Sequence, residues 1–585
     1  MLEITTKFQN KLYLIVGIFC IFLSTTLVAQ DMNNIMARNN AGGEKEKNAQ
    51  AESYFIDGQK FYLLEDYASA LRSFKLAAAL YPDNAAINYK IAQIQYLQGN
   101  TSEALTYIDL ALKNDSGNRY YYELAAEIYR EIGNFKEAAR VYENLLEVMP
   151  EALDVYVDLA EIYIYLNENA KALYALEKAE ETLGISPEII SEKQKILLQE
   201  DRLEDAISEG VKLTEAYPEE PSFIISLSNI LISLDRPQEA AEYLREYLAN
   251  QGESSEVRLM LAETDRIQGS ENDAKENLLI AFKDPQLDIR NKIQIVGTYI
   301  EMLPNLELEP FVSDLAVTLV NVHDESAVAH GMYADFLFAI NRPHEALESY
   351  IKSVKLDESN FQVWQNILSL QLQFDKIDEL EEYAEKALEY FPNVASIYFF
   401  NGSAKIRKND YAEAISMFET GSMYASKNEE LGLLFLGQLG DAYNGAKNYK
   451  KSDEAYEKAL AIDPNNGYVL NNYSYYLSMR GDKLERAQEL SARLIKNYPN
   501  NPNYLDTHAW VLYKLEKYEK ALPILIDALK TIEGASNGTI VEHYGDVLFK
   551  LGKSDLAMEQ WIKAKSLGNA SEWIEKKIAE GKLYE

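Results

Sequence analysis

The chain has 585 residues, with 57 Lys or Arg against 93 Asp or Glu, and its formal net charge at pH 7 is −36. Such an excess of acidic residues disfavours a nucleic-acid partner, because binding to a phosphate backbone depends on clustered Lys and Arg. Hydrophobic residues make up 47% of the chain, which is the ordinary share for a folded protein and argues against general disorder.

Residues 1–29 have the pattern of a secretory signal peptide. Lys7 and Lys11 precede an apolar run that ends in small residues, with Ala29 as the last residue before the expected cleavage point. The apolar run spans roughly 18 residues, so an uncleaved membrane anchor remains the alternative. The single cysteine, Cys20, lies in this segment, so the exported chain would hold no disulfide. We therefore expect an exported protein, and the cleavage context VAQ and the wealth of Asn, Lys and Ile favour the periplasm or cell envelope of a bacterium.

Residues 30–50 are polar and contain a Gly-Gly pair, so we expect a flexible linker there. From residue 51 onward the sequence becomes periodic. Small residues recur at intervals of 34, as the series Ala70, Ala104, Ala138, Ala172, Ala206, Ala240 and Ala274 shows. A second series runs twelve residues ahead of it: Gly58, Ala92, Ala126, Ala160, Gln194, Ser228 and Ala262. Self-similarity at a fixed period near 34 predicts an array of helical repeats.

The first unit, residues 51–84, shows what each repeat does physically. Gly58 lies on the expected first helix, where a missing side chain lets a second helix approach closely. Ala70, Phe74 and Ala77 are four and three residues apart, so they share one face of the expected second helix. Pro82 ends that helix. A hairpin of two short helices cannot bury its apolar face alone, so it must stack on its neighbours.

This order resembles the tetratricopeptide repeat, a 34-residue helix-turn-helix with small residues at positions 8, 20 and 27, aromatic residues at 11 and 24, and proline at 32. The resemblance implies an all-α fold, a right-handed α-solenoid of about 14 repeats. The phase predicts seven repeats in 51–285, a divergent helix pair in 286–326, about seven further repeats in 327–571, and a cap helix in 572–585.

No catalytic set emerges from the sequence. His344 begins the stretch HEALE, which is similar to the zinc-binding HExxH helix but lacks its second histidine. A hydrolase built on His344 is therefore the weakest alternative, and we expect no enzyme activity, no metal and no cofactor.

In the tetratricopeptide repeat family, positions 2, 5, 9, 12 and 13 of each repeat often point into a concave groove. The resemblance therefore implies a partner-binding surface of aromatic and polar residues, the mixture that peptide-binding surfaces use. Its members are Tyr120, Glu123, Glu127, Glu161 and Tyr165 in the first array, and Tyr468, Asn471, Tyr475, Asp506, Trp510, Tyr513, Glu542, Asp546 and Phe549 in the second. The family's Lys-and-Asn carboxylate clamp is absent, since Phe55 and Gln59 occupy its first two positions in the first repeat.

The leading hypothesis is a non-enzymatic scaffold or adaptor of the bacterial cell envelope that binds a protein or peptide. One alternative is a structural subunit of an envelope assembly or secretion machinery, which a retained N-terminal anchor would favour. A glycan-binding module that uses exposed tyrosines is another. We expect membrane contact only if the N-terminal segment is retained.

Overall fold

The computed structural model describes residues 43–303, 305–425 and 427–584. These residues form 32 α-helices and one short 3₁₀ helix, with no strand among them, so the expected all-α solenoid is confirmed. The predicted signal peptide lies outside the described residues, as does most of the predicted linker. The described residues divide into two compact units, of which the first ends at Asn277 and the second begins at Leu278.

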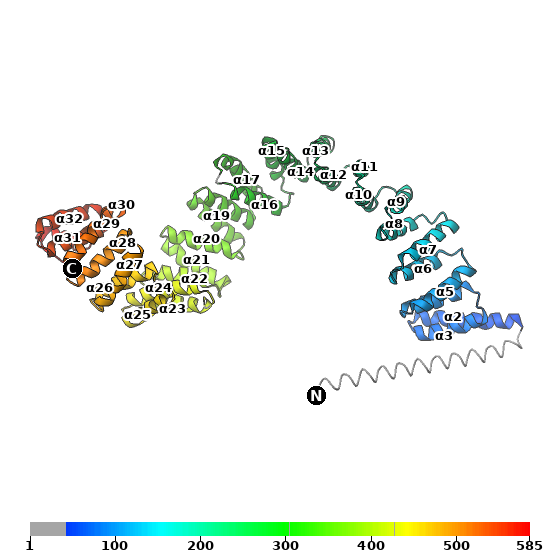
Figure 1. Cartoon of the computed structure of the whole chain (residues 1–585), viewed down its shortest axis with the longest axis horizontal. Coiled ribbons are helices and arrows are strands. Elements are labelled where there is room, and N and C mark those ends of the chain that lie inside the picture. The colour runs from blue at the N-terminus through cyan, green and yellow to red at the C-terminus, as the bar shows by residue number, and fades with distance from the viewer. Residues whose placement is uncertain (1–42, 304, 426, 585) are drawn as a thin grey trace, which may run out of the picture. The chain divides into compact units, whose positions relative to one another are not determined.

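The first unit consists of stacked helix pairs, coloured blue to green in Figure 1. Each first helix packs on the second helix that follows it, and the next pair stacks on that second helix. The helices are α2 (Glu44–Leu63), α3 (Tyr67–Leu80), α4 (Ala85–Leu97), α5 (Thr101–Asn114), α6 (Arg119–Glu131), α7 (Phe135–Val148), α8 (Val155–Tyr165), α9 (Asn169–Leu183), α10 (Pro187–Gln199), α11 (Leu203–Ala216), α12 (Pro221–Ser233), α13 (Pro237–Gln251), α14 (Ser255–Ile267) and α15 (Glu271–Phe282), whose last turn belongs to the second unit.

After the end of α15, the second unit continues with α16 (Ile289–Glu301), the 3₁₀ helix η1 (Leu306–Leu308) and α17 (Glu309–Val322), which occupy the segment expected to diverge. The helices that follow are α18 (Ala327–Ala339), α19 (Pro343–Leu356), α20 (Phe361–Gln373), α21 (Ile377–Tyr390), α22 (Ala395–Arg407), α23 (Tyr411–Tyr424), α24 (Glu429–Gly445), α25 (Tyr449–Ile462), α26 (Gly467–Arg480), α27 (Leu484–Asn497), α28 (Pro502–Lys514), α29 (Tyr518–Ala528), α30 (Ile532–Ser536), α31 (Gly538–Lys550), α32 (Ser554–Leu567) and α33 (Ile574–Glu580).

The 34-residue alanine series lies where helices touch. Six of its members, from Ala70 to Ala240, are fully buried, and Ala274 is 2% exposed. The turn inside each hairpin repeats as well, because a residue with left-handed backbone recurs at the same interval. The series is Glu65, Gly99, Gly133, Asn167, Asp201, Asp235 and Gly269, with φ between 55° and 78°. Gly, Asn and Asp tolerate this conformation best, and it commonly ends a helix.

The first helix begins earlier than the sequence analysis predicts. Because α2 starts at Glu44, residues 44–50 are helical, and their assignment to a flexible linker is corrected. Glu44 and Glu46 lie in the first turn of α2, where negative charge is favoured by the helix dipole. Ala51, one turn further on, is buried and fixes this end of the helix against the repeat.

Candidate functional site

The first helices of successive repeats in the first unit (α2, α4, α6, α8, α10, α12 and α14) form one surface, here called the first-helix face. One groove on this face lies between α8 and α10 and has a volume of about 670 Å³. Val157 and Ile164 of α8 and Ile189 of α10 line it with apolar surface, and Glu161, Glu188 and Glu192 add carboxylates.

Local sequence explains how these side chains come together. Val157, Glu161 and Ile164 are four and three residues apart, so they project from one face of α8. The hydroxyl of Ser186 accepts a hydrogen bond from the backbone N–H of Ile189, and Pro187 occupies the first turn of α10. This cap fixes where α10 begins and so holds Ile189 beside α8.

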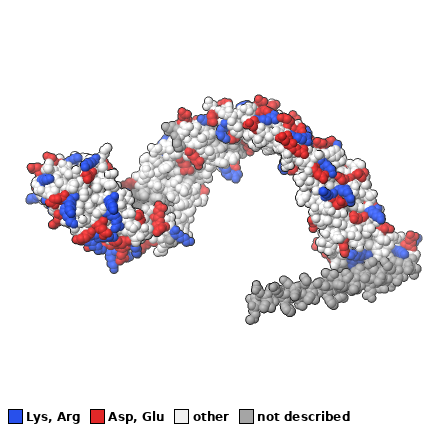
Figure 2. All heavy atoms as spheres, viewed as in Figure 1, with Lys and Arg blue, Asp and Glu red and all other residues white. Residues whose placement is uncertain are grey.

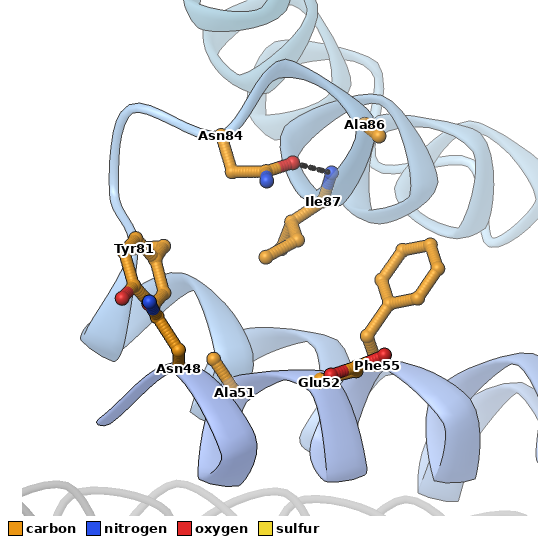
Figure 3. A pocket seen from close by; sticks show the side chains of 8 residues that line it. All are labelled: Asn48, Ala51, Glu52, Phe55, Tyr81, Asn84, Ala86 and Ile87. Carbon is orange, nitrogen blue, oxygen red and sulfur yellow. Dashed lines mark hydrogen bonds between the residues drawn. The ribbon is translucent and has the colours of Figure 1, made fainter. Parts of the chain in front are cut away.

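A second groove on the first-helix face, of about 320 Å³, lies between α2 and α4. Figure 3 shows Phe55 and Ala51 on α2 facing Ile87 of α4, with Tyr81 at one side. The side-chain oxygen of Asn84 caps α4 by accepting from the backbone N–H of Ile87. Glu52 is the one carboxylate among the residues that line this groove, so it is less acidic than the groove between α8 and α10.

Two of the predicted aromatic residues are open to solvent on this face. Tyr165 is 65% exposed and stacks on Phe135 of the preceding repeat, with ring centroids 3.8 Å apart. Tyr120 is 60% exposed. Exposed aromatic rings held by a neighbouring ring are suited to act as anchors for a partner.

The predicted carboxylates of the first array each have a partner within the chain. Arg119 bridges Glu123 at 2.7 Å and Asp154 at 2.8 Å. The hydroxyl of Tyr96 donates to Glu127 at 3.2 Å. The bonds from Arg119 to Asp154 and from Tyr96 to Glu127 connect adjacent repeats. On the face in view, acidic and basic side chains are interspersed along this unit (Figure 2).

Glu161 is bound in the same manner, since Arg130 donates to one of its oxygens at 3.0 Å. The side chain of Glu161 nevertheless remains 59% exposed. Glu161 can therefore contact a second cation without losing the first.

In the second unit, Tyr468 belongs to a hydrogen-bonded network around Asp441. The carboxylate of Asp441 accepts from the hydroxyls of Tyr456, at 2.6 Å, and Tyr468, and from the amide of Asn472 at 3.1 Å. Burial raises the pKa of the Asp441 carboxyl. The sequence analysis did not single out Asp441, although it occupies the ninth position of its repeat, as Glu127 and Glu161 do.

Asn471 and Tyr475 belong to the packing between α26 and its neighbours. The amide oxygen of Asn471 accepts from the hydroxyl of Thr507 at 2.7 Å. Tyr475 is half-buried, and its ring centroid lies 5.9 Å from that of Tyr476.

The prediction that Asp506, Trp510 and Tyr513 form an open binding surface is wrong, because all three are buried. Trp510 is 7% exposed and stacks between Tyr513, at 4.7 Å, and His543, at 4.0 Å. Asp506 lies 2.9 Å from Nδ1 of His543. Burial favours the neutral imidazole, but the Asp506 carboxylate outweighs it and raises the pKa of His543.

Glu542 and Asp546 are likewise buried, at 2% and 1% exposure, so their prediction as open groove residues is also wrong. The chain after α32 folds back, and α33 places the ammonium of Lys577 2.8 Å from Glu542 and 2.7 Å from Asp546. Burial raises the pKa of Asp546 despite this cation. Phe549 is half-buried, with its ring 5.5 Å from that of Trp561.

His344 stacks flat on Phe374, with ring centroids 3.9 Å apart. Within the described ranges, no three His, Cys, Asp or Glu side chains are grouped so that they could hold a metal ion. In this same part of the chain, every helix is too short or too polar to cross a membrane.

Family models of the tetratricopeptide repeat match residues 62–128, 124–187, 435–466 and 455–489, so these stretches carry tetratricopeptide repeats. The chain is 22% identical over 369 residues to the TPR repeat-containing protein YpiA of Bacillus subtilis (strain 168), which covers 61% of this chain and 83% of that protein. It is 25% identical over 215 residues to the BBSome complex member BBS4 homolog of Drosophila melanogaster, which covers 34% of this chain and 43% of that protein. The chain thus spans less than half of the second relative.

Comparison with solved structures gives matches with low TM-scores, of which two are described here. Yeast Tom70 is 16% identical, with 85% of this chain and 94% of that chain covered and a TM-score of 0.33. A tetratricopeptide repeat protein from Parabacteroides merdae ATCC 43184 is 15% identical, with 44% and 99% covered and a TM-score of 0.37. Scores this low support neither a shared overall shape nor a shared function.

Proposed function

We propose that this chain is a non-enzymatic scaffold that binds segments of partner proteins along its first-helix face. The groove between α8 and α10 carries the proposal. Its volume of about 670 Å³ lies within the usual range of ligand sites. Val157 and Ile164 keep part of their apolar surface exposed there, and Tyr165 stands exposed at the end of the same helix.

The proposed site of action is the cell envelope of a bacterium. Its support is the composition of residues 1–29, in which basic residues precede an apolar run and a small residue. Fractionation of the native cells tests the location, and N-terminal sequencing of the isolated protein tests cleavage. A mature chain that begins at Gln30 supports export with cleavage, and a cytosolic chain that begins at Met1 rejects it.

A permanent structural subunit is the second candidate function. It is favoured by the name of one relative, which is described as a member of a complex. A subunit would co-purify with its assembly at fixed stoichiometry, whereas an adaptor would exchange its partners.

Affinity capture from extracts of the native cells tests the scaffold function. Tyr165→Ser removes an exposed aromatic ring from the first-helix face, and Tyr174→Ser removes one from the second helix α9, where it is 55% exposed. We expect Tyr165→Ser to lose the partner that the wild-type chain and Tyr174→Ser retain. Capture of glycans on an array, with no protein captured, would favour the glycan-binding alternative instead.

A further inference from the structure

We propose that the groove between α8 and α10 binds a cationic amphipathic peptide segment, in which Lys or Arg side chains alternate with apolar ones. This inference rests on the proposed function, because it names the chemistry of the partner at the same site.

The floor of the groove selects for apolar side chains. Val157 and Ile164 are partly exposed along one side, and Ile189 is 5% exposed on the other. A partner side chain that covers them removes apolar surface from water, which favours association by roughly 25 cal/mol per Å² before the costs of ordering. An extended segment presents alternate side chains to such a floor and to its edges.

The charge of the groove selects for cations. The residues that line it include the carboxylates of Glu161, Glu188 and Glu192, and no Lys or Arg among the described residues lines it. Arg130 binds one oxygen of Glu161, and Lys195 binds one oxygen of Glu192 at 2.6 Å. The rim thus carries three negative charges against two nearby positive ones, which leaves a net negative charge for a partner to neutralise.

In the second unit, a lysine of this chain binds two acidic residues on the first helix of a repeat. Glu542 and Asp546 occupy positions 5 and 9 of the last repeat, and Lys577 of the chain's own α33 binds both of them. The ammonium of Lys577 also lies near the Trp561 ring, with Nζ 5.9 Å from the ring centroid. Glu161 occupies the same ninth position in its own repeat, where no segment of the described chain covers it.

Fluorescence anisotropy with the purified full-length chain tests the proposal, and the probe is a labelled nonapeptide of alternating Lys and Leu. We expect binding that weakens about fivefold in the double variant Glu161→Gln/Glu188→Gln, since each exposed charge contact contributes up to about 1 kcal/mol. Raising NaCl from about 50 to about 300 mM should weaken wild-type binding as well, because salt screens exposed charges.

The matched control is Glu147→Gln/Glu177→Gln, which removes two exposed carboxylates from the second helices α7 and α9. Equal weakening by the control variant would show that the peptide senses only the overall charge, and would overturn the proposal. Equal binding of a peptide with Glu in place of Lys would also overturn it. Ile164→Ala, which shortens the floor, should weaken binding of the Lys-Leu peptide but not binding of a Lys-Ser peptide.

Peptide binding and partner capture together distinguish failure of the cationic-peptide proposal from failure of the scaffold proposal. If the peptide does not bind while capture of a native partner still depends on Tyr165, the cationic class is wrong and the scaffold function stands. If the peptide fails to bind and capture does not depend on Tyr165, both proposals are rejected. Circular dichroism of each variant verifies that it is folded.

Discussion

Replacing Lys577 with methionine should loosen the last repeat of the solenoid. Lys577 is buried, and its ammonium donates to Glu542 at 2.8 Å and to both oxygens of Asp546 at 2.8 and 2.7 Å. Lys577→Met keeps most of the apolar stem but removes the charge. Two carboxylates, whose side chains are 3% and 1% exposed, then remain buried without a cation.

The expected cost is about 3 to 5 kcal/mol, the usual effect of removing one partner from a buried ion pair. Protonation of a carboxyl group limits this cost, and burial already raises the pKa of Asp546. Without Lys577 the folded state binds a proton more readily than the unfolded state, so stability is gained as the pH falls through the raised pKa. The loss of unfolding free energy caused by Lys577→Met should therefore be largest near pH 7 and smaller near pH 5.

Hydrogen exchange measured by mass spectrometry locates the effect. Repeats of a solenoid contact only their neighbours, so faster exchange should be confined to α31, α32 and the helices beside them. Lys563→Met, at an exposed position of α32, is the matched control and should leave exchange unchanged. Adding Glu542→Gln and Asp546→Asn to Lys577→Met should restore much of the lost protection. Unchanged exchange in α31 for Lys577→Met alone would refute the reasoning.

Three further predictions follow from buried positions. Ala138→Leu should lower the free energy of unfolding by about 1–3 kcal/mol, because Ala138 is fully buried between helices; an unchanged denaturation midpoint would mean that the repeat register is wrong. Gly440→Ala should lower the thermal midpoint, because its Cβ would overlap the ring of Tyr456, whereas Gly432→Ala on the same helix has open space and should gain up to about 1 kcal/mol. His508 is buried, and burial lowers its pKa to about 4, so it stays neutral in the fold. The stabilisation that comes from keeping His508 neutral, on the order of 3 kcal/mol, is fully present above the pKa of the unfolded state and is lost as the pH falls to about 4. His508→Asn should remove this part of the pH dependence of the free energy of unfolding.

Sequence spacing was sufficient to predict the repeat fold because small residues at a fixed interval fit only where two helices touch. The left-handed turn residues, such as Asn167 and Asp201, recur at the same interval. This signal was present in the sequence and would have located the hairpin turns directly.

The buried state of the C-terminal residues could not be predicted in this way. Spacing places Glu542 on a first helix, but it does not show that the segment after α32 returns and brings Lys577 onto the same surface. Likewise, Trp510 lies at a groove position by spacing and is nevertheless buried, because His543 of the next repeat stacks on its ring. Contacts between elements, rather than the period of one element, decide which of these positions remain open.

Site-specific photo-cross-linking tests the central claim most directly. A photoreactive phenylalanine replaces Tyr165 on the first-helix face in one variant and Tyr174 on the second helix α9 in the other; both positions are exposed. The account predicts that, in native cells, the probe at Tyr165 cross-links a partner protein and the probe at Tyr174 does not. Cross-linking of the partner from Tyr174 alone would contradict the assignment of the first-helix face as the binding surface.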